Sequence, residues 1–280
     1  MTGRRRVGRA FLHLAIILGC FIMTYPLLWM LVSSFKVNDE IFKNESLIPH
    51  SFTLANYALG WTSLPDATFG RFFANTGIIV AFSIIGTLIS SSMAGYAFAR
   101  LSFYLRNLFF ALMLVTLMLP LNVTVIPQYI IFFHLHWINT YWPLTLPQFL
   151  GVQGFFIFLM VQFIRSIPRE LDQAAHIDGC GPIRTYLHLI VPLSVPAFVA
   201  TTILTFIWTW NDFFRQLLYI SSVSLYTVAL GLRMFTSSMG NSSWGALFAM
   251  SILSLLPLFL LFVFLQRFII EGVVAGGVKG

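Results

Sequence analysis

The sequence predicts an all-α integral membrane protein with six transmembrane helices. Of its 280 residues, 58% are hydrophobic and 9% are charged, and the mean hydropathy is +0.87. Soluble domains carry about 25% charged residues. Apolar runs recur that are long enough to span, since roughly 20 helical residues cross a hydrocarbon core of about 30 Å. The strands of a transmembrane barrel would need an alternating pattern of about 10 residues, which these runs lack.

The first two runs each read as one uninterrupted helix. Residues 10–32 follow a basic stretch and resemble a secretory signal peptide, but about 23 apolar residues are too many for the apolar core of such a peptide and enough for a span. Residues 72–99 carry a series of small side chains, including Gly86 and Gly95. Small side chains let neighbouring helix backbones approach closely, so we expect this span to pack tightly.

The third run is the least regular. Pro120 and Pro127 lie within residues 107–131, where proline removes a backbone hydrogen bond and kinks a helix. Such breaks are tolerated where they face protein or a water-filled cavity. These prolines are therefore either hinges of a transport path or passive kinks. The last three spans are expected at residues 141–164, 194–212 and 244–268.

Basic and tryptophan residues give the spans an orientation. Most Lys and Arg residues fall on one side of the predicted membrane, namely Arg4, Arg5, Arg6, Arg9, Arg100, Arg106, Arg165, Arg169, Arg184, Arg267 and Lys279. Cytoplasmic loops carry such an excess, so both termini are expected in the cytoplasm. Tryptophan favours the headgroup layer, and all tryptophans fall towards the opposite side. The positive-inside bias accounts for the net charge of +7, so no nucleic-acid partner is expected.

The polar segments are too short to form a soluble domain. The longest are residues 34–71 outside and 165–192 inside, so residues 1–280 are expected to form a single transmembrane domain. The outer segment is rich in residues that form turns and helix caps, and we expect short interfacial helices in it. Cys20 and Cys180 lie at different levels of the membrane, and no disulfide is expected.

The inner segment reads as two short amphipathic helices. The first opens near residues 166–168 and ends at Gly179, because glycine tolerates the positive φ that often terminates a helix. The second begins at Gly181. In it Ile183, Tyr186, Leu187 and Ile190 recur at the spacing of one helical stripe. A helix pair of this kind suits insertion into a cleft on another protein, and small Ala174 and Ala175 permit close approach.

This segment resembles the EAA loop of ABC importer permeases. In that loop Glu-Ala-Ala is followed by three residues and Gly, and then by an apolar stretch ending in Leu-Pro. The matching positions are Leu171, Asp172, Gln173, Ala174, Ala175, Asp178, Gly179 and Pro192. The resemblance extends over most of the chain and points to the maltose-type carbohydrate branch, second-permease kind. It is carried also by residues 25–36, by Asn75-Thr76, by Trp210-Asn211-Asp212-Phe213 and by the tail 275–280.

The resemblance implies a fold, a location and partners. The fold is a type I ABC importer permease bundle with a cytoplasmic helical coupling loop, in the inner membrane of a prokaryote. The partners are a homologous second permease, two ABC ATPase subunits and an extracytoplasmic solute-binding protein, within membrane lipid. The EAA-like positions between Leu171 and Gly179, with Pro192, would couple this chain to the ATPase. Movement of the ATPase would turn the bundle from inward-open to outward-open.

The loop departs from the family at two positions that matter. Gln173 stands where the family has the Glu of Glu-Ala-Ala, and Asp172 stands for the Glu before it. A contact that depends on the lost charge would weaken from about 1.5–3 kcal/mol towards about 1 kcal/mol. Either Asp172 replaces it or the partner differs; the sequence leaves both open.

Motifs for other activities are absent. No phosphate-binding loop of the form Gly-x-x-x-x-Gly-Lys-Ser/Thr occurs, so ATP and Mg²⁺ are expected on the partner ATPase and no cofactor on this chain. No zinc motif occurs, and the six histidines form no recognisable metal-ligand set. The chain is therefore expected to be a transport subunit and not an enzyme.

Two other interpretations remain at this stage. A self-sufficient secondary carrier or channel would use the polar loop as a plain connector, but such carriers usually need ionisable or unwound midplane sites. Asp212 is the only carboxylate near a helix interior. An intramembrane enzyme would need a catalytic constellation that the sequence lacks.

The solute itself is not readable from the sequence. Polar or aromatic residues near helix ends are candidates for the substrate pathway by type and depth: Asn75, Asn122, Gln128, Trp210, Asn211 and Asp212. Asn211 and Asp212 either meet a sugar or stabilise a turn. Oligosaccharides, disaccharides and glycerol phosphate compounds all fit.

Overall fold

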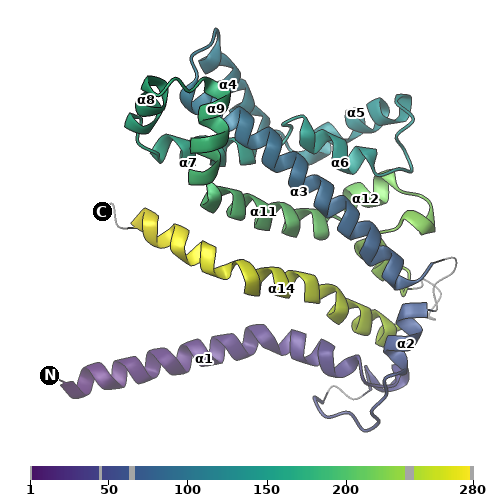
Figure 1. The fold of residues 1–280 in the computed structure, drawn as a ribbon. Coiled ribbons are helices and arrows are strands. Elements are labelled where there is room, and N and C mark those ends of the chain that lie inside the picture. The colour runs from purple at the N-terminus through teal and green to yellow at the C-terminus, as the bar shows by residue number, and fades with distance from the viewer. Residues whose placement is uncertain (1, 44–45, 63–66, 237–242, 278–280) are drawn as a thin grey trace. The chain divides into compact units, whose positions relative to one another are not determined.

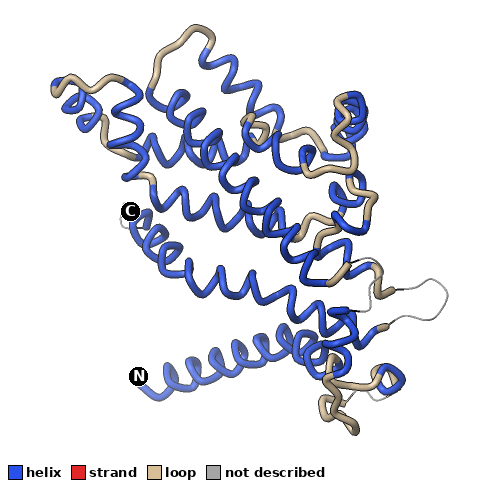
Figure 2. The backbone as a smooth tube through the Cα atoms, turned by 45° about the vertical axis from the view of Figure 1, so that its right-hand side comes forward, coloured by secondary structure: helices blue, strands red, loops and turns tan. Residues whose placement is uncertain are grey.

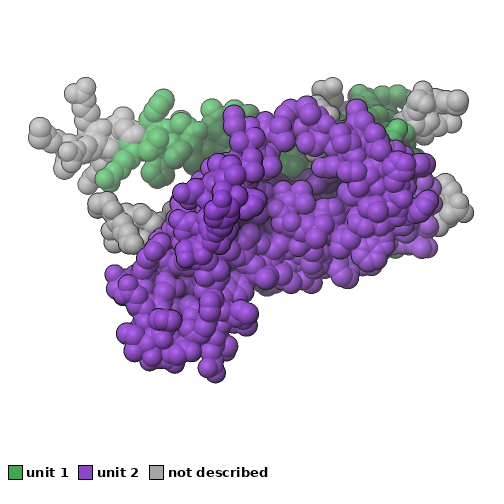
Figure 3. All heavy atoms as spheres, turned by 90° about the horizontal axis from the view of Figure 1, so that it is seen from above, with its two compact units in different colours: residues 1–70, 231–256 green, residues 71–230, 257–280 purple. Residues whose placement is uncertain are grey.

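The computed structural model describes the backbone of residues 2–43, 46–62, 67–236 and 243–277, and the side chains of these except 2–8, 10, 121–122 and 267–277. Within these ranges every regular element is a helix and none is a strand (Figure 1, Figure 2). The all-α prediction is confirmed there. The chain forms two compact units, residues 1–70 with 231–256 and residues 71–230 with 257–280 (Figure 3).

Four helical stretches are long and apolar enough to cross a membrane, or five if one bent pair is a single span. The four are Phe11–Ser33, Phe69–Arg100, Trp142–Ser166 and Trp244–Gln266, and the bent pair joins Pro182–Leu193 to Val195–Trp210 at 74°. The expected third span is two helices, α4 (Arg106–Thr116) and α5 (Leu121–His134), with Pro120 extended between them. The count of six spans therefore stays a prediction.

The first unit contains α1 (Thr2–Ser33), η1 (Asn38–Glu40), α2 (Ala55–Thr62) and the beginning of α14 (Trp244–Gly277). The chain after α1 is held by polar contacts. Asn56 Nδ2 donates to the carbonyls of Ser34, at 2.8 Å, and Lys36, at 2.7 Å. The ammonium of Lys36, fully buried, donates to the carbonyl of Ser46 at 2.7 Å. The outer segment thus folds into short helices, as its composition predicts.

The second unit holds most of α3 and the remaining helices. Their bounds are α6 Trp142–Phe149, α7 Gly154–Ser166, α8 Glu170–Ile177, α9 Pro182–Thr185, the π-helix η2 Tyr186–Ile190, α10 Val191–Leu193, α11 Val195–Trp210, α12 Phe214–Tyr219, η3 Val223–Leu225 and α13 Val228–Arg233. Helix α3, Phe69–Arg100, runs through this unit.

Two apolar clusters lie along α3. One joins its last turns to α7, η2 and α11 through Tyr96, Ala99, Met160, Ile164, Ile167, Ile190 and Ala197. The other joins its first part to α5, α6 and α12 through Ile79, Phe132, Leu144, Tyr219, Ile220 and Leu230. Figure 1 shows α8 and α9 towards one end of α3, and α6 and α12 towards the other.

The small residues of α3 allow close packing, as the sequence predicts. A Cβ at Gly95 would stand 2.6 Å from the Cβ of Met160 on α7, and one at Gly86 would stand 2.6 Å from the ring of Phe149 on α6. Several α3 hydroxyls bond within their own helix. Ser91 Oγ donates to the carbonyl of Thr87 at 2.5 Å, and Thr76 Oγ1 donates to that of Phe72 at 2.8 Å.

Candidate functional site

The first helix of the segment 165–192, which we call the coupling segment, is α8. It begins at Glu170, two residues later than expected, because Pro168 holds the preceding Ile167 extended at ψ 132°. It ends as predicted at Gly179, whose φ is +78°. The Gly179 amide donates to His176 O at 3.0 Å and the Cys180 amide to Ala175 O at 2.9 Å. This is the Schellman pattern that glycine favours.

The second half of the segment differs from the predicted stripe. Ile190 is buried and Tyr186 half-buried, but Ile183 is 76% exposed and Leu187 is 53% exposed. The apolar side chains of the stripe are therefore divided between packing within the chain and exposure. Residues 186–190 form a π-helix, whose wider turn departs from the 3.6-residue periodicity on which the stripe is predicted.

Three side chains on one face of α3 hold the coupling segment. Arg100 Nη2 donates to the carbonyl of Ile167 at 2.6 Å, and Arg100 Nε lies 3.1 Å from Asp172 Oδ2 on α8. One turn earlier, Tyr96 Oη donates to the carbonyl of Pro182 at 3.1 Å. Ser92 shares a 2.7 Å hydrogen bond with the hydroxyl of Tyr186. Ser92, Tyr96 and Arg100 recur every four residues and so lie on one face; we call them the C-terminal contacts of α3.

The Arg100–Asp172 contact is a partly buried ion pair. The Arg100 side chain is 6% exposed and that of Asp172 is 24% exposed. The Nε–H is not directed at Oδ2 closely enough to make a hydrogen bond, so attraction between the charges dominates the contact. Removing one partner of a fully buried pair costs about 3–5 kcal/mol, and the cost here is smaller because water reaches Asp172. The Asp172 carboxylate is therefore used in an ion pair within the chain.

A cavity of about 470 Å³ lies between the end of α3 and the coupling segment. Its polar lining includes Tyr96, Arg100, Arg169, Asp172, Gln173 and His176. Gln173 thus lines the cavity together with two arginines and one carboxylate. In the described part of the chain no group of three or more His, Cys, Asp or Glu side chains could hold a metal ion.

The predicted coupling residues occupy different environments. Asp172 and Ala175 are half-buried, whereas the others are exposed: Leu171, Gln173, Ala174, Asp178, Gly179 and Pro192. Pro192 stands near the end of the continuous helical stretch Pro182–Leu193, where it cannot donate a backbone hydrogen bond to the preceding turn. Ile177 is 85% exposed at the end of α8. With Leu171, Ile183 and Leu187 it gives the segment four large exposed aliphatic side chains.

Most of the substrate-pathway candidates whose side chains are described make contacts within the fold. Asn75 Nδ2 donates to the carbonyls of Ser224, at 3.0 Å, and Tyr226, at 2.8 Å. The Trp210 ring is 6% exposed and stacks on Phe206 at 5.3 Å. Gln128 is half-buried on α5. The side chain of Asn122 lies outside the described residues.

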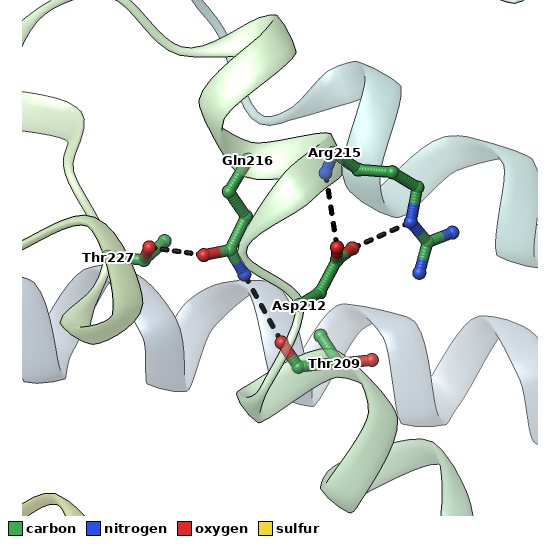
Figure 4. A network of polar contacts seen from close by, with 5 residues as sticks. All are labelled: Thr209, Asp212, Arg215, Gln216 and Thr227. Carbon is green, nitrogen blue, oxygen red and sulfur yellow. Dashed lines mark hydrogen bonds and ion pairs between the residues drawn. The ribbon is translucent and has the colours of Figure 1, made fainter. Parts of the chain in front are cut away.

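Asn211 and Asp212 take part in local structure after α11. Asn211 Nδ2 donates to the carbonyl of Ile207 at 2.8 Å. Asp212 accepts from the Arg215 amide at 3.2 Å and from Arg215 Nε at 2.6 Å, and so caps α12 (Figure 4). Beside it Gln216 donates to Thr209 O at 3.2 Å and accepts from Thr227. Of the two roles open for Asp212, this geometry favours stabilising a turn.

Comparison with known proteins shows the family to which the chain belongs. Residues 86–274 match the family described as binding-protein-dependent transport system inner membrane component. The chain belongs to this family. Its relatives include a probable ABC transporter permease, YurM, of Bacillus subtilis, 33% identical over 274 residues, which are 98% of this chain and 90% of that protein.

Two further likenesses span nearly the whole chain. The trehalose/maltose transport system permease protein MalG of Thermococcus litoralis is 32% identical over 97% of each chain. A chain from the crystal structure of a bacterial ABC transporter involved in import of the acidic polysaccharide alginate has a TM-score of 0.83 at 18% identity, covering 95% of this chain and 98% of that one. The latter shows a shared fold.

As a binding-protein-dependent permease, the chain is a multi-pass inner membrane protein and a transport component, not an enzyme. The sequence analysis did not predict that Arg100 holds the coupling segment. It used Arg100 only as one of the basic residues that indicate the cytoplasmic side. The signal was present, because Ser92, Tyr96 and Arg100 place polar groups every fourth residue along an apolar helix. Their partners could not be read, since Ile167 and Pro182 contribute backbone carbonyls.

Proposed function

We propose that this chain is one permease subunit of an ATP-driven importer for a sugar or sugar-like solute. It pairs with a homologous second permease to enclose the translocation pathway. A solute-binding protein delivers the solute at the outer face, and a separate ATPase docks on the coupling segment at the cytoplasmic face, where both termini lie. Family membership supports the transport system, and the likeness to the trehalose/maltose permease of Thermococcus litoralis supports the solute class.

The observation that carries the coupling role is that the segment is held to the bundle and also presents apolar side chains. It is held to α3 through Asp172, Pro182 and Tyr186. Ile177 and Ile183 are exposed. Exposed aliphatic side chains with polar residues around them are typical of a docking surface. A segment that is both fixed to α3 and exposed in this way suits the transfer of motion from a partner.

The ion pair that Asp172 makes within the chain decides whether Asp172 can replace the family Glu that is absent at position 173. Because its carboxylate pairs with Arg100 at 3.1 Å, Asp172 does not replace the charge absent at Gln173. We propose that Gln173 meets the ATPase through neutral hydrogen bonds, and that apolar contacts supply most of the docking energy. Of the pathway candidates, Gln128 and Asn122 stay proposals for solute contact, while Asn75, Trp210, Asn211 and Asp212 serve the fold.

Reconstitution tests the function directly. The chain, its companion permease and ATPase are placed in liposomes, and ATP hydrolysis is measured with and without the binding protein. We expect stimulation in the wild type and its loss in Gly179→Pro, since proline fixes φ near −65° where +78° is needed. Gly181→Ala is the control, because Gly181 has φ −74° and open space around it. Solute uptake without any ATPase would refute the importer.

A further inference from the structure

Helix α3 is bound by polar groups at both of its ends. Its C-terminal contacts, Ser92, Tyr96 and Arg100, hold the coupling segment. Near its beginning Asn75 donates to the carbonyls of Ser224 and Tyr226, and Thr76 Oγ1 accepts from the Val228 amide at 2.9 Å. Asn75 is 7% exposed and Thr76 is fully buried. We call these two residues the N-terminal contacts of α3.

The segment 221–228 that the N-terminal contacts hold is itself irregular. It contains only the short η3, Val223–Leu225. The amides of Ser221 and Ser222 donate to Asn139 Oδ1 at 3.1 and 2.9 Å. Its backbone groups are therefore bonded largely to side chains of other elements. Displacing α3 or residue 139 would carry this segment along.

The helix between the two sets of contacts is suited to moving as one piece. Residues 75 and 100 stand about 38 Å apart along the axis, at 1.5 Å rise per residue. Sharp kinks occur mostly at proline, and α3 contains none, whereas α1 and α14 contain Pro26 and Pro257. Polar contacts thus join α3 to the coupling segment near one end and to residues 221–228 near the other, and between them Ser90 Oγ donates to the carbonyl of Gln148 on α6 at 2.7 Å.

We propose that Arg100 and Asn75 are positioning residues for transport: through them α3 joins the coupling segment to residues 221–228, so that displacement of the first displaces the second. This rests on the proposed function, because it supplies the route by which ATPase movement reaches the other end of the permease. In this proposal neither residue binds the solute or the ATPase. Both act by keeping α3 bonded to elements that move.

The first test measures whether residues 221–228 respond to nucleotide. In the assembled importer, hydrogen–deuterium exchange of their amides is compared with and without a non-hydrolysed ATP analogue. We expect a difference in the wild type and none in Asp172→Asn or Asn75→Ser, although both still bind the analogue. Asp39→Asn removes an exposed carboxylate outside the coupling segment and should behave as wild type.

The second test measures solute taken up per ATP hydrolysed. Arg100→Gln should lower this ratio by about 5- to 150-fold, the usual size of coupling between two sites. Arg100→Lys should be intermediate, because an ammonium cannot make the planar two-partner contact. The exchanged pair Arg100→Asp with Asp172→Arg should recover part of the ratio lost in Arg100→Gln, because it restores the attraction between positions 100 and 172.

The outcomes separate the two proposals. If wild-type complexes show no stimulated hydrolysis, the importer function fails and this inference falls with it. If the wild type is stimulated but Asp172→Asn and Asn75→Ser keep the full nucleotide response at residues 221–228, the inference is overturned and the importer stands. Because the two substitutions lie at opposite ends of α3, misassembly of one variant leaves the other as a test.

Discussion

Gly95 on α3 and Met160 on α7 meet so closely that no side chain fits between the two helices. A Cβ built on Gly95 would stand 2.6 Å from the Met160 Cβ and 3.3 Å from its carbonyl carbon. Neither atom belongs to the flexible end of a side chain, so the backbone of α7 would have to move. The close approach brings together Tyr96, Met160 and Ile164 of the first apolar cluster.

Gly95→Ala should therefore destabilise the permease by about 1–3 kcal/mol, the usual cost of overpacking. Thermal unfolding of the purified protein in detergent measures this. Gly77→Ala is the matched control on the same helix, because nothing lies within 4 Å of its Cβ position. It should be neutral or stabilising by about 0.5–1 kcal/mol. Equal effects of the two substitutions would contradict the close approach.

Ile177→Asp should abolish binding of the ATPase and leave the fold intact. Ile177 is 85% exposed, so a carboxylate there costs the isolated chain little, whereas a charge in an apolar interface loses its hydration. Co-purification of the ATPase with the detergent-solubilised permease is the measurement. Ile48→Asp, at a residue 77% exposed in the outer segment, is the control and should retain the ATPase. Retention by both variants would argue against docking on α8.

Cys180 offers a test of orientation. It is half-buried beside Gly179, and the other cysteine, Cys20, is exposed on α1. In a Cys20→Ala background, a membrane-impermeant maleimide should label inside-out vesicles and leave right-side-out vesicles unlabelled. Labelling from the outer face would reverse the predicted topology. Added ATPase should slow the labelling, because docking would cover the end of α8.

Asn139→Ala should destabilise the segment 221–228. Asn139 has φ +60°, and its Oδ1 accepts from the amides of Ser221 and Ser222. An amide left without a partner costs about 1–3 kcal/mol. Asn139→Asp keeps the acceptor and should retain most of the stability. Thermal unfolding compares the two variants, and an equal loss in both would assign the effect to Nδ2, which donates to Ser222 Oγ at 2.7 Å.

The sequence predicts the helical elements of this permease well where a local rule decides them. Gly179 ends α8 because positive φ favours glycine, and apolar length marks the helices beginning at Phe69 and Trp244. The division at Pro120 follows from the restriction that proline imposes on its own backbone. Each of these features depends on a few neighbouring residues.

Features that depend on partners distant in sequence were beyond such rules. The π-helix from Tyr186 to Ile190 changes which residues are buried, and the apolar periodicity of the sequence does not predict a π-helix there. Asn75 and Asp212 have the residue types of a sugar site, yet their polar groups meet Tyr226 and Arg215. Residue type and depth do not distinguish a ligand contact from an internal bond, because both need the same donors and acceptors.

The hydroxyl groups along the middle of α3 have a consequence for motion within the bilayer. The hydroxyl of Ser91 donates to a carbonyl one turn back in the same helix. A polar group that carries its own acceptor needs none from a neighbour. When α3 shifts against α7, this bond travels with it, and the Ser91 hydroxyl is not stranded in hydrocarbon at any stage. Ser91 can therefore exchange neighbours at little electrostatic cost, whereas Ser90, whose hydroxyl donates to the carbonyl of Gln148 on α6 at 2.7 Å, cannot.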